Sequence, residues 1–161
     1  SLLEEPVTNE QYNDLEVAPY TPQTSPDNEF MFQRGENPLN SDTFSGPYYL
    51  TSLIGGDNVA GSPELHYVVF EPGTINNWHI HEGGQILIAT DGIGYHQIKG
   101  EPAQVLHPGD IAYCPPGETH WHGASANTGF AHVSVNTNPE MTGLTWYDRI
   151  TEEDYQSLPT S

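Results

Sequence analysis

Three features of the sequence predict an all-β fold, arranged as a closed or double-sheet antiparallel barrel. From Pro47 onward the chain consists of short runs rich in β-branched and aromatic residues. Turn-forming pairs such as Pro72-Gly73 and Asp91-Gly92 separate these runs. The 161 residues suit one domain that can bury a hydrophobic core. Many short strands at such spacing are typical of a single barrel.

The expected strands follow one another through the middle of the chain. Residues 48–54 and 66–71 come first, and a short segment around His79 follows the Pro72-Gly73 turn. Asp91-Gly92 is a strong hairpin signal, so residues 94–98 should return beside residues 85–90. The later strand-length runs are residues 105–106, 111–114, 120–123 and 129–137.

The two ends of the chain differ from this middle part. The first thirty residues hold seven acids and no base, so residues 1–45 are predicted to be an acidic, partly ordered arm, with a short helix at residues 7–15. The barrel is expected over residues 46–140. Residues 141–161 form a C-terminal extension, in which Thr151 and the acids after it predict a short capped helix.

Composition narrows the range of partners. Three Lys and Arg against 22 Asp and Glu give a net charge of −19, which argues against nucleic acid or an anionic membrane and favours a small neutral organic molecule. No apolar run approaches 18 residues and no signal-peptide core is present, so a cytoplasmic location is expected, although the start at Ser1 without Met is compatible with a removed leader. The single cysteine, Cys114, is expected to be a buried packing residue.

Histidines at alternating positions are the strongest functional signal. In an extended strand, residues two apart project to the same face, so His79 and His81 can point together, with Gln85 following, and so can His120 and His122. Neutral imidazoles bind divalent first-row metals readily. We predict that imidazoles from these two pairs, together with the side-chain oxygen of Gln85, bind one metal ion and leave coordination sites open for catalysis. Gln85 could instead hydrogen-bond a bound water.

Glycines and a proline at fixed spacing surround these histidines. The first motif is Gly73, five residues, His79, one residue, His81, three residues, Gln85, six residues and Gly92; the second is Gly109, five residues, Pro115, one residue, Gly117, two residues and His120. Both motifs resemble those of the cupin family, with Gln85 where Glu is usual and Ala124 where Asn is usual. The three-His-plus-Gln set, followed by His120-Trp121-His122, is similar to the small manganese-dependent cupins that include cupin hydroxynitrile lyases.

The resemblance implies a single cupin jelly roll with one divalent metal per chain, bound by His79, His81, Gln85 and His120. Manganese is the expected metal, with iron, nickel or zinc as other candidates. A neutral amide in place of a carboxylate leaves more charge on the ion, which makes it a stronger Lewis acid. The implied reaction is C–C cleavage or addition of the hydroxynitrile-lyase type. Two alternatives stay open at this point, a metal-dependent cupin dioxygenase and a non-catalytic module that binds a metal and a small molecule.

The remaining histidines and tryptophans divide by strand parity. His122 shares the face of His120, and the resemblance places His132 in the metal pocket, so both are candidates for proton transfer, with a structural role as the alternative. Trp78 and Trp121 alternate away from the ligands and should pack in the protein. The other histidines, His66, His96 and His107, carry no comparable pattern.

Association follows from the expected architecture. A small jelly roll leaves sheet edges whose backbone groups are unpaired, and a second copy of the chain can cover them. We therefore expect a homodimer, to which the N-terminal arm could contribute.

Overall fold

A computed structural model describes residues 30–55 and 61–160. The helix predicted at residues 7–15 lies outside these ranges. The elements are β1 (Tyr48–Ile54), β2 (Glu64–Phe70), β3 (His79–His81), β4 (Gln85–Gly92), β5 (Gly94–Ile98), β6 (Gln104–Leu106), β7 (Ile111–Cys114), β8 (Thr119–Ala124), β9 (Phe130–Asn136), β10 (Leu144–Trp146) and the helix α2 (Glu152–Gln156).

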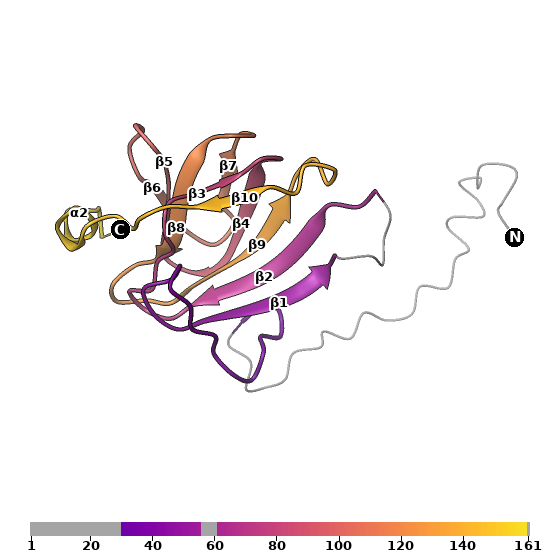
Figure 1. Ribbon diagram of the computed structural model, residues 1–161. Coiled ribbons are helices and arrows are strands. Elements are labelled where there is room, and N and C mark those ends of the chain that lie inside the picture. The colour runs from indigo at the N-terminus through magenta and orange to yellow at the C-terminus, as the bar shows by residue number, and fades with distance from the viewer. Residues whose placement is uncertain (1–29, 56–60, 161) are drawn as a thin grey trace, which may run out of the picture.

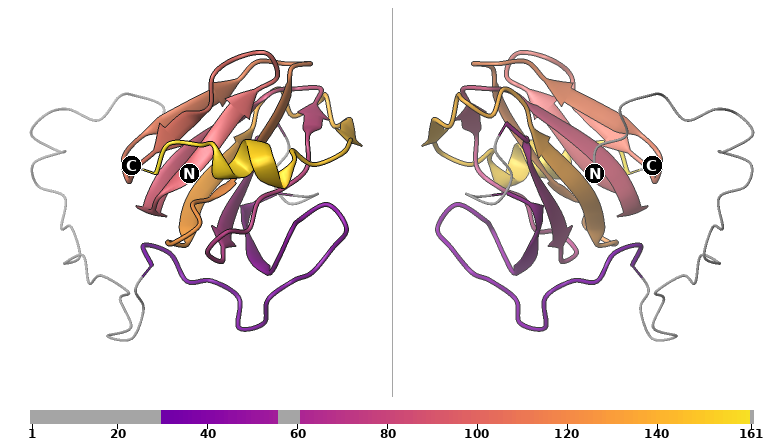
Figure 2. Two further views of the ribbon diagram at one scale, coloured as in Figure 1. Left: turned by 90° about the vertical axis from the view of Figure 1, so that its left-hand side faces the viewer. Right: turned by 90° about the vertical axis from the view of Figure 1, so that its right-hand side faces the viewer.

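The strands form two five-stranded sheets that lie against each other (Figures 1 and 2). Sheet I has the order β1-β2-β9-β4-β7 and sheet II the order β10-β3-β8-β5-β6, with all pairings antiparallel. Between them lies a core of apolar side chains from both sheets, including Phe70 and Phe130 from sheet I and Leu106 from sheet II. The predicted all-β jelly roll is confirmed.

The hairpin predicted at Asp91-Gly92 is wrong. β4 pairs with β7 and β9 in sheet I, whereas β5 pairs with β6 and β8 in sheet II. The chain therefore crosses from one sheet to the other at this point. Gly92 has a φ of 69°, and a Cβ there would collide with the carbonyl oxygen of Gly129. The same glycine that signals a hairpin thus allows a corner between sheets.

The C-terminal extension contributes a strand that the sequence pattern does not predict. β10 pairs with β3, and Trp146 lies opposite His79, so a segment expected outside the metal-binding part of the chain borders it directly. The predicted helix is present as α2, with the Thr151 side chain accepting a hydrogen bond from the backbone of Asp154 (3.1 Å). Figure 1 shows α2 beside sheet II, where Tyr155 and Leu158 pack against Trp121 on the outer face.

The described part of the arm, residues 30–45, packs on the outer face of sheet I. The Phe32 ring lies 5.2 Å from that of Tyr67, and the Arg34 guanidinium stands 4.0 Å above the Tyr49 ring. The end of this segment turns inward, where Phe44 stacks on Tyr48 at 3.7 Å and contacts the core between the sheets. Within residues 30–55 and 61–160, no helix has both the length and the apolar character needed to cross a membrane.

Candidate metal centre

Two strands of sheet II bring the predicted ligand histidines together. In the antiparallel pair of β3 and β8, His79 lies directly opposite His120, and both side chains are almost fully buried. Their ring centroids are 4.3 Å apart. His122, two residues after His120, faces the same side, and the nitrogens of His79, His120 and His122 that could bind an ion lie within 4.8 Å of one another. The sheet register therefore produces a buried histidine cluster that could hold a metal ion.

Hydrogen bonds to the outer nitrogens orient two of these rings. Nδ1 of His79 donates to the backbone oxygen of Asn77 (2.8 Å), which leaves Nε2 with a lone pair. Nδ1 of His120 is 2.9 Å from Nε2 of His96, while Nε2 of His120 is buried and has no hydrogen-bond partner among the described residues. Both rings are thus held in the way that metal-binding imidazoles usually are.

Gln85 begins β4 in sheet I and lines the same cavity as His79 and His81. Its Nε2 donates to Oδ1 of Asn136 (3.1 Å). Its Oε1 is buried and, among the described residues, accepts no hydrogen bond. A buried amide oxygen without a donor is destabilising by about 1–3 kcal/mol. A cation would relieve this cost for Gln85 Oε1 and for His120 Nε2, so the residues present fit a divalent metal.

His81 is placed differently from the other predicted ligands. Its ring centroid is 5.1 Å from that of His79 and 5.8 Å from that of His120, and the side chain is partly exposed at the cavity mouth. His122 takes the third place in the tight cluster. The metal-ligand role of His81 therefore stays a prediction.

His122 and His132 lie deeper in the barrel, with ring centroids 5.0 Å apart. His122 is held by Asn76, whose Nδ2 is 3.2 Å from Nε2 of His122 and whose Oδ1 accepts from the His122 backbone N–H (2.9 Å). His132 packs between Phe70 and Phe130, and neither of its ring nitrogens has a partner among the described residues. His132 therefore carries an unused lone pair next to the cluster.

Burial keeps these histidines neutral. It lowers the pKa of His79 to about 3, that of His81 to about 4 and that of His132 to about 3. Burial, together with the charge that neighbouring histidines would carry, also lowers the pKa of His120 and His122 well below the usual value. Neutral imidazoles can bind a metal or accept a proton, which imidazolium cannot.

A cavity of about 380 Å³ opens in front of the histidines. Its walls are largely apolar and include Phe44 from the arm, Val68 from sheet I, and Leu144 and Trp146 from β10. Its volume falls in the range of small-molecule sites. Sequence reasoning did not find the contributions of the arm and of β10, because they come from outside the histidine motifs.

His96 is a second residue that sequence reasoning did not identify. It lies opposite His122 in the β5 and β8 pair, is 3% exposed, and contacts His120. Strand parity could have identified it only if the pairing of β5 with β8 were known. Cys114 lies near His96 and His120, and burial raises the pKa of its thiol to about 12, so it is a protonated packing residue as expected. Trp121 is fully buried on the outer side of sheet II, which confirms its packing role.

Comparison with known proteins agrees with this architecture. A family profile described as a cupin domain matches residues 66–135. The curated (R)-mandelonitrile lyase of Granulicella tundricola is 35% identical over 119 residues, which cover 72% of this chain and 88% of the lyase. The chain belongs to the cupin family.

Solved cupin structures extend the likeness beyond the matched segment. The crystal structure of a cupin-like protein from Thermotoga maritima superposes on this cupin with a TM-score of 0.72 at 38% identity, covering 78% of this chain and 93% of that one. A cupin 2 conserved barrel domain protein from Salinispora arenicola gives a TM-score of 0.51 at 26% identity, covering 58% and 78% of the respective chains.

Proposed function

We propose that this cupin is a divalent-metal-dependent lyase that cleaves, and in reverse forms, the C–C bond of small neutral cyanohydrins. One observation carries the proposal: Gln85, His120 and His132 have buried polar atoms that find no hydrogen-bond partner among the described residues, and these atoms lie in the barrel interior together with an apolar cavity. The name of the relative, (R)-mandelonitrile lyase, supports the substrate class.

The proposed ligands of the metal are His79, His81, Gln85 and His120. Imidazole and amide donors suit several first-row ions, and manganese is our first choice, with iron, nickel and zinc as alternatives. A divalent ion held by these residues would supply Lewis acidity toward the substrate oxygen.

The cavity walls select the substrate. Phe44, Leu144 and Trp146 offer apolar contact to an aryl or alkyl group, and the ring of Trp146 lies 4.5 Å from that of His79. Glu64 at the cavity edge disfavours anionic substrates, as does the net charge of −19. A neutral cyanohydrin with a hydrophobic substituent meets these requirements.

His132 is the proposed proton acceptor, and His122 is its neighbour and alternative. The neutral His132 ring takes the proton of the substrate hydroxyl, and the oxygen electrons form the carbonyl double bond. The pair of electrons in the C–C bond leaves with cyanide, which then takes the proton back from the imidazolium as hydrogen cyanide. Asn76 fixes the orientation of His122 beside this path.

Metal removal tests the proposal. Chelator-treated protein should lose cleavage of racemic mandelonitrile, and added MnCl₂ should restore it, while His120→Gln should stay inactive after metal is added. His107→Gln is the matched control, because His107 is exposed and, within residues 30–55 and 61–160, its polar contacts are with nearby Asp110. Full turnover in the stripped protein contradicts the proposal, and oxygen uptake coupled to substrate loss selects the dioxygenase alternative instead.

A further inference from the structure

Three polar side chains form a row across sheet I, beside the proposed metal ligands. Glu64 on β2 lies opposite Asn136 on β9, and Asn136 lies opposite Gln85 on β4. Directly opposed residues in antiparallel strands have side chains on the same face and in contact distance. The register alone thus connects an exposed carboxylate to a buried amide through one intermediate residue.

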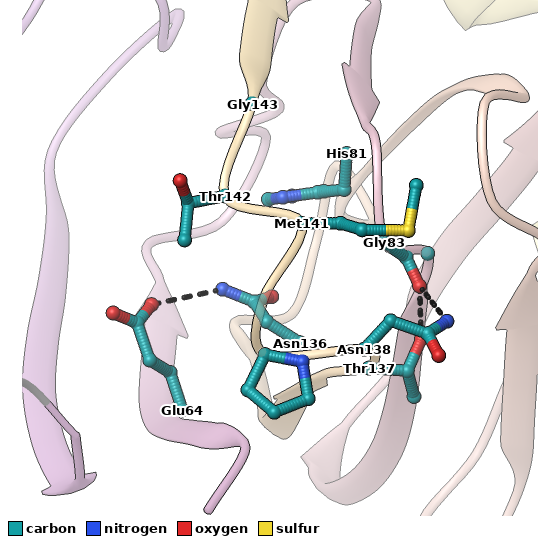
Figure 3. A pocket seen from close by; sticks show the side chains of 11 residues that line it. Glu64, His81, Gly83, Asn136, Thr137, Asn138, Met141, Thr142 and Gly143 are labelled. Atoms are coloured by element: carbon teal, nitrogen blue, oxygen red, sulfur yellow. Dashed lines mark hydrogen bonds between the residues drawn. The ribbon is translucent and has the colours of Figure 1, made fainter. Parts of the chain in front are cut away.

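Hydrogen bonds run along the whole row. Nδ2 of Asn136 donates to Oε2 of Glu64 (3.3 Å), a contact visible at the edge of a small cavity in Figure 3. Nε2 of Gln85 donates to Oδ1 of Asn136 (3.1 Å). Oε1 of Gln85 ends this row of hydrogen bonds, because it is buried and has no donor among the described residues.

The direction of the hydrogen bonds along the row follows from Glu64, its first member. An ionised carboxylate only accepts hydrogen bonds, so Glu64 requires the NH₂ group of Asn136. Asn136 must then turn its oxygen toward Gln85, and Gln85 must donate a hydrogen bond to it from its own NH₂ group. The oxygen of Gln85, rather than its NH₂ group, is left for the cavity that His79 and His81 also line.

We propose that Glu64, acting through Asn136, is a positioning residue that selects the amide oxygen of Gln85 as a metal ligand. The proposal rests on the metal centre of the proposed function and adds a reason why a glutamine works there. An amide can present a ligand or a donor with nearly the same shape, and the NH₂ group cannot bind a cation. The carboxylate at the far end also polarises both amides in the sense that makes Oε1 more negative.

A charge reversal at position 64 tests the direction of the hydrogen bonds along the row. Lysine only donates, so Glu64→Lys requires the oxygen of Asn136, turns its NH₂ group toward Gln85, and points the NH₂ group of Gln85 into the cavity. Adding Gln85→Glu to that variant should strengthen metal binding again, because the introduced carboxylate accepts a hydrogen bond from the turned Asn136 and gives the cavity an anionic oxygen. With Glu64 retained, the same Gln85→Glu change places a second acceptor opposite the Asn136 oxygen.

The measurement is a titration of the metal-free full chain with MnCl₂, followed by the electron paramagnetic resonance signal of free Mn²⁺. Glu82→Lys is the matched control, because Glu82 is an exposed acid next to His81 but is not part of the row. We expect Glu64→Lys to weaken binding roughly tenfold or more, the size of other losses of support behind a ligand. Glu82→Lys should weaken binding by less than about threefold, since an exposed charge is screened by solvent.

The double variant distinguishes an effect carried by the hydrogen bonds of the row from a simple effect of charge on the metal. Gln85→Glu should improve Mn²⁺ binding far more when combined with Glu64→Lys than when introduced alone, whereas independent charge effects would improve both equally. Two results would overturn the positioning role of Glu64 and leave the metal centre intact. One is an equal loss of Mn²⁺ affinity in Glu64→Lys and Glu82→Lys, and the other is an equal gain of affinity from Gln85→Glu in both backgrounds. A wild-type chain that binds no Mn²⁺ overturns both the positioning role and the metal centre. Circular dichroism and thermal unfolding confirm that the exposed substitutions leave the fold in place.

Discussion

Nε2 of His96 lies 2.9 Å from Nδ1 of His120, deep between the two sheets. The pair assigns a tautomer: if Nδ1 of His120 carries the proton and donates it to His96, Nε2 of His120 keeps its lone pair for the cluster. His96 in turn lies opposite Gln104 on β6, the edge strand of sheet II. His96 thus holds His120 from behind.

His96→Phe should weaken metal binding, whereas His96→Gln should largely preserve it. Glutamine can still accept the His120 proton through its side-chain oxygen, but phenylalanine cannot. We expect a loss of about tenfold in Mn²⁺ affinity for the phenylalanine variant. Titration with MnCl₂ checks this, with thermal unfolding in parallel. Wild-type affinity in a folded His96→Phe protein would mean that the contact is only packing.

The metal-free protein should lose stability as the pH falls below neutrality. The pKa values of His79 and His132 are about 3 and those of His81 and His96 about 4 in the folded chain, against 6.5 when unperturbed. The unfolded state therefore binds protons first, and stability that is complete above about pH 6.5 declines down to about pH 3, the folded-state pKa of His79 and His132. Each such histidine contributes up to about 1.4 kcal/mol per pH unit.

Thermal unfolding in the presence of chelator, from pH 8 to pH 4, measures this decline. His132→Phe should reduce the slope, because the ring that replaces the imidazole beside Phe70 and Phe130 binds no proton. His107→Gln, at an exposed position, serves as the control. A melting temperature that is constant between pH 7 and pH 5 would contradict the neutral burial of these rings.

His132→Gln should reduce cyanohydrin cleavage while leaving the metal in place. General acid–base catalysis by a positioned side chain contributes about 10²- to 10⁴-fold, so turnover should fall by that factor. His132 is not one of the proposed ligands, and Mn²⁺ affinity should stay within about threefold of wild type, less than the loss expected behind a ligand. Steady-state assays with His122→Gln alongside decide which ring moves the proton. Unchanged turnover in the His132 variant would transfer the role to His122.

The exposed outer face at the β7 edge predicts a homodimer. Ile111 is 60% exposed and Tyr113 54%, beside Ile88 at 38% on the neighbouring strand β4. Exposed apolar side chains on an edge strand favour pairing with a second copy. Sedimentation velocity should give a dimer that Ile111→Lys converts to a monomer, whereas Met141→Lys, at an exposed apolar position outside the strands, should have no effect. Salt should strengthen the dimer, since it screens the repulsion between two chains of charge −19. A wild-type monomer at high concentration would rule this out.

Local patterns in the sequence are sufficient for most of the fold. Most strands from β1 to β9 coincide with runs of β-branched and aromatic residues, and Thr151 marks the start of α2. β10 is not predicted because its three residues are too few to establish alternation and, unlike β3, contain no histidine pair that marks them. The Asp91-Gly92 corner resembles a hairpin because a left-handed glycine serves a hairpin and a sheet-to-sheet crossing equally well.

The site is predictable only where spacing within one strand decides geometry. Parity predicts that His120 and His122 share one face of their strand, but the pairing of β3 with β8 is what brings His79 to them. Two of the contacts that support them, His96 on His120 and Asn136 on Gln85, depend on which strands become neighbours. Pairing is a long-range property of the fold, and a single sequence read along its length does not contain it in a local pattern.

The cavity has two sources in the chain. The histidines that carry the chemistry lie inside residues 66–135, the segment matched by the cupin profile, whereas Phe44, Leu144 and Trp146 on its walls lie outside that segment. For the proposed lyase, exchanging the flanks should therefore change substrate preference while the proposed metal ligands stay in place. A chain trimmed to the matched segment would retain all eight histidines but lose these three apolar residues of the cavity wall.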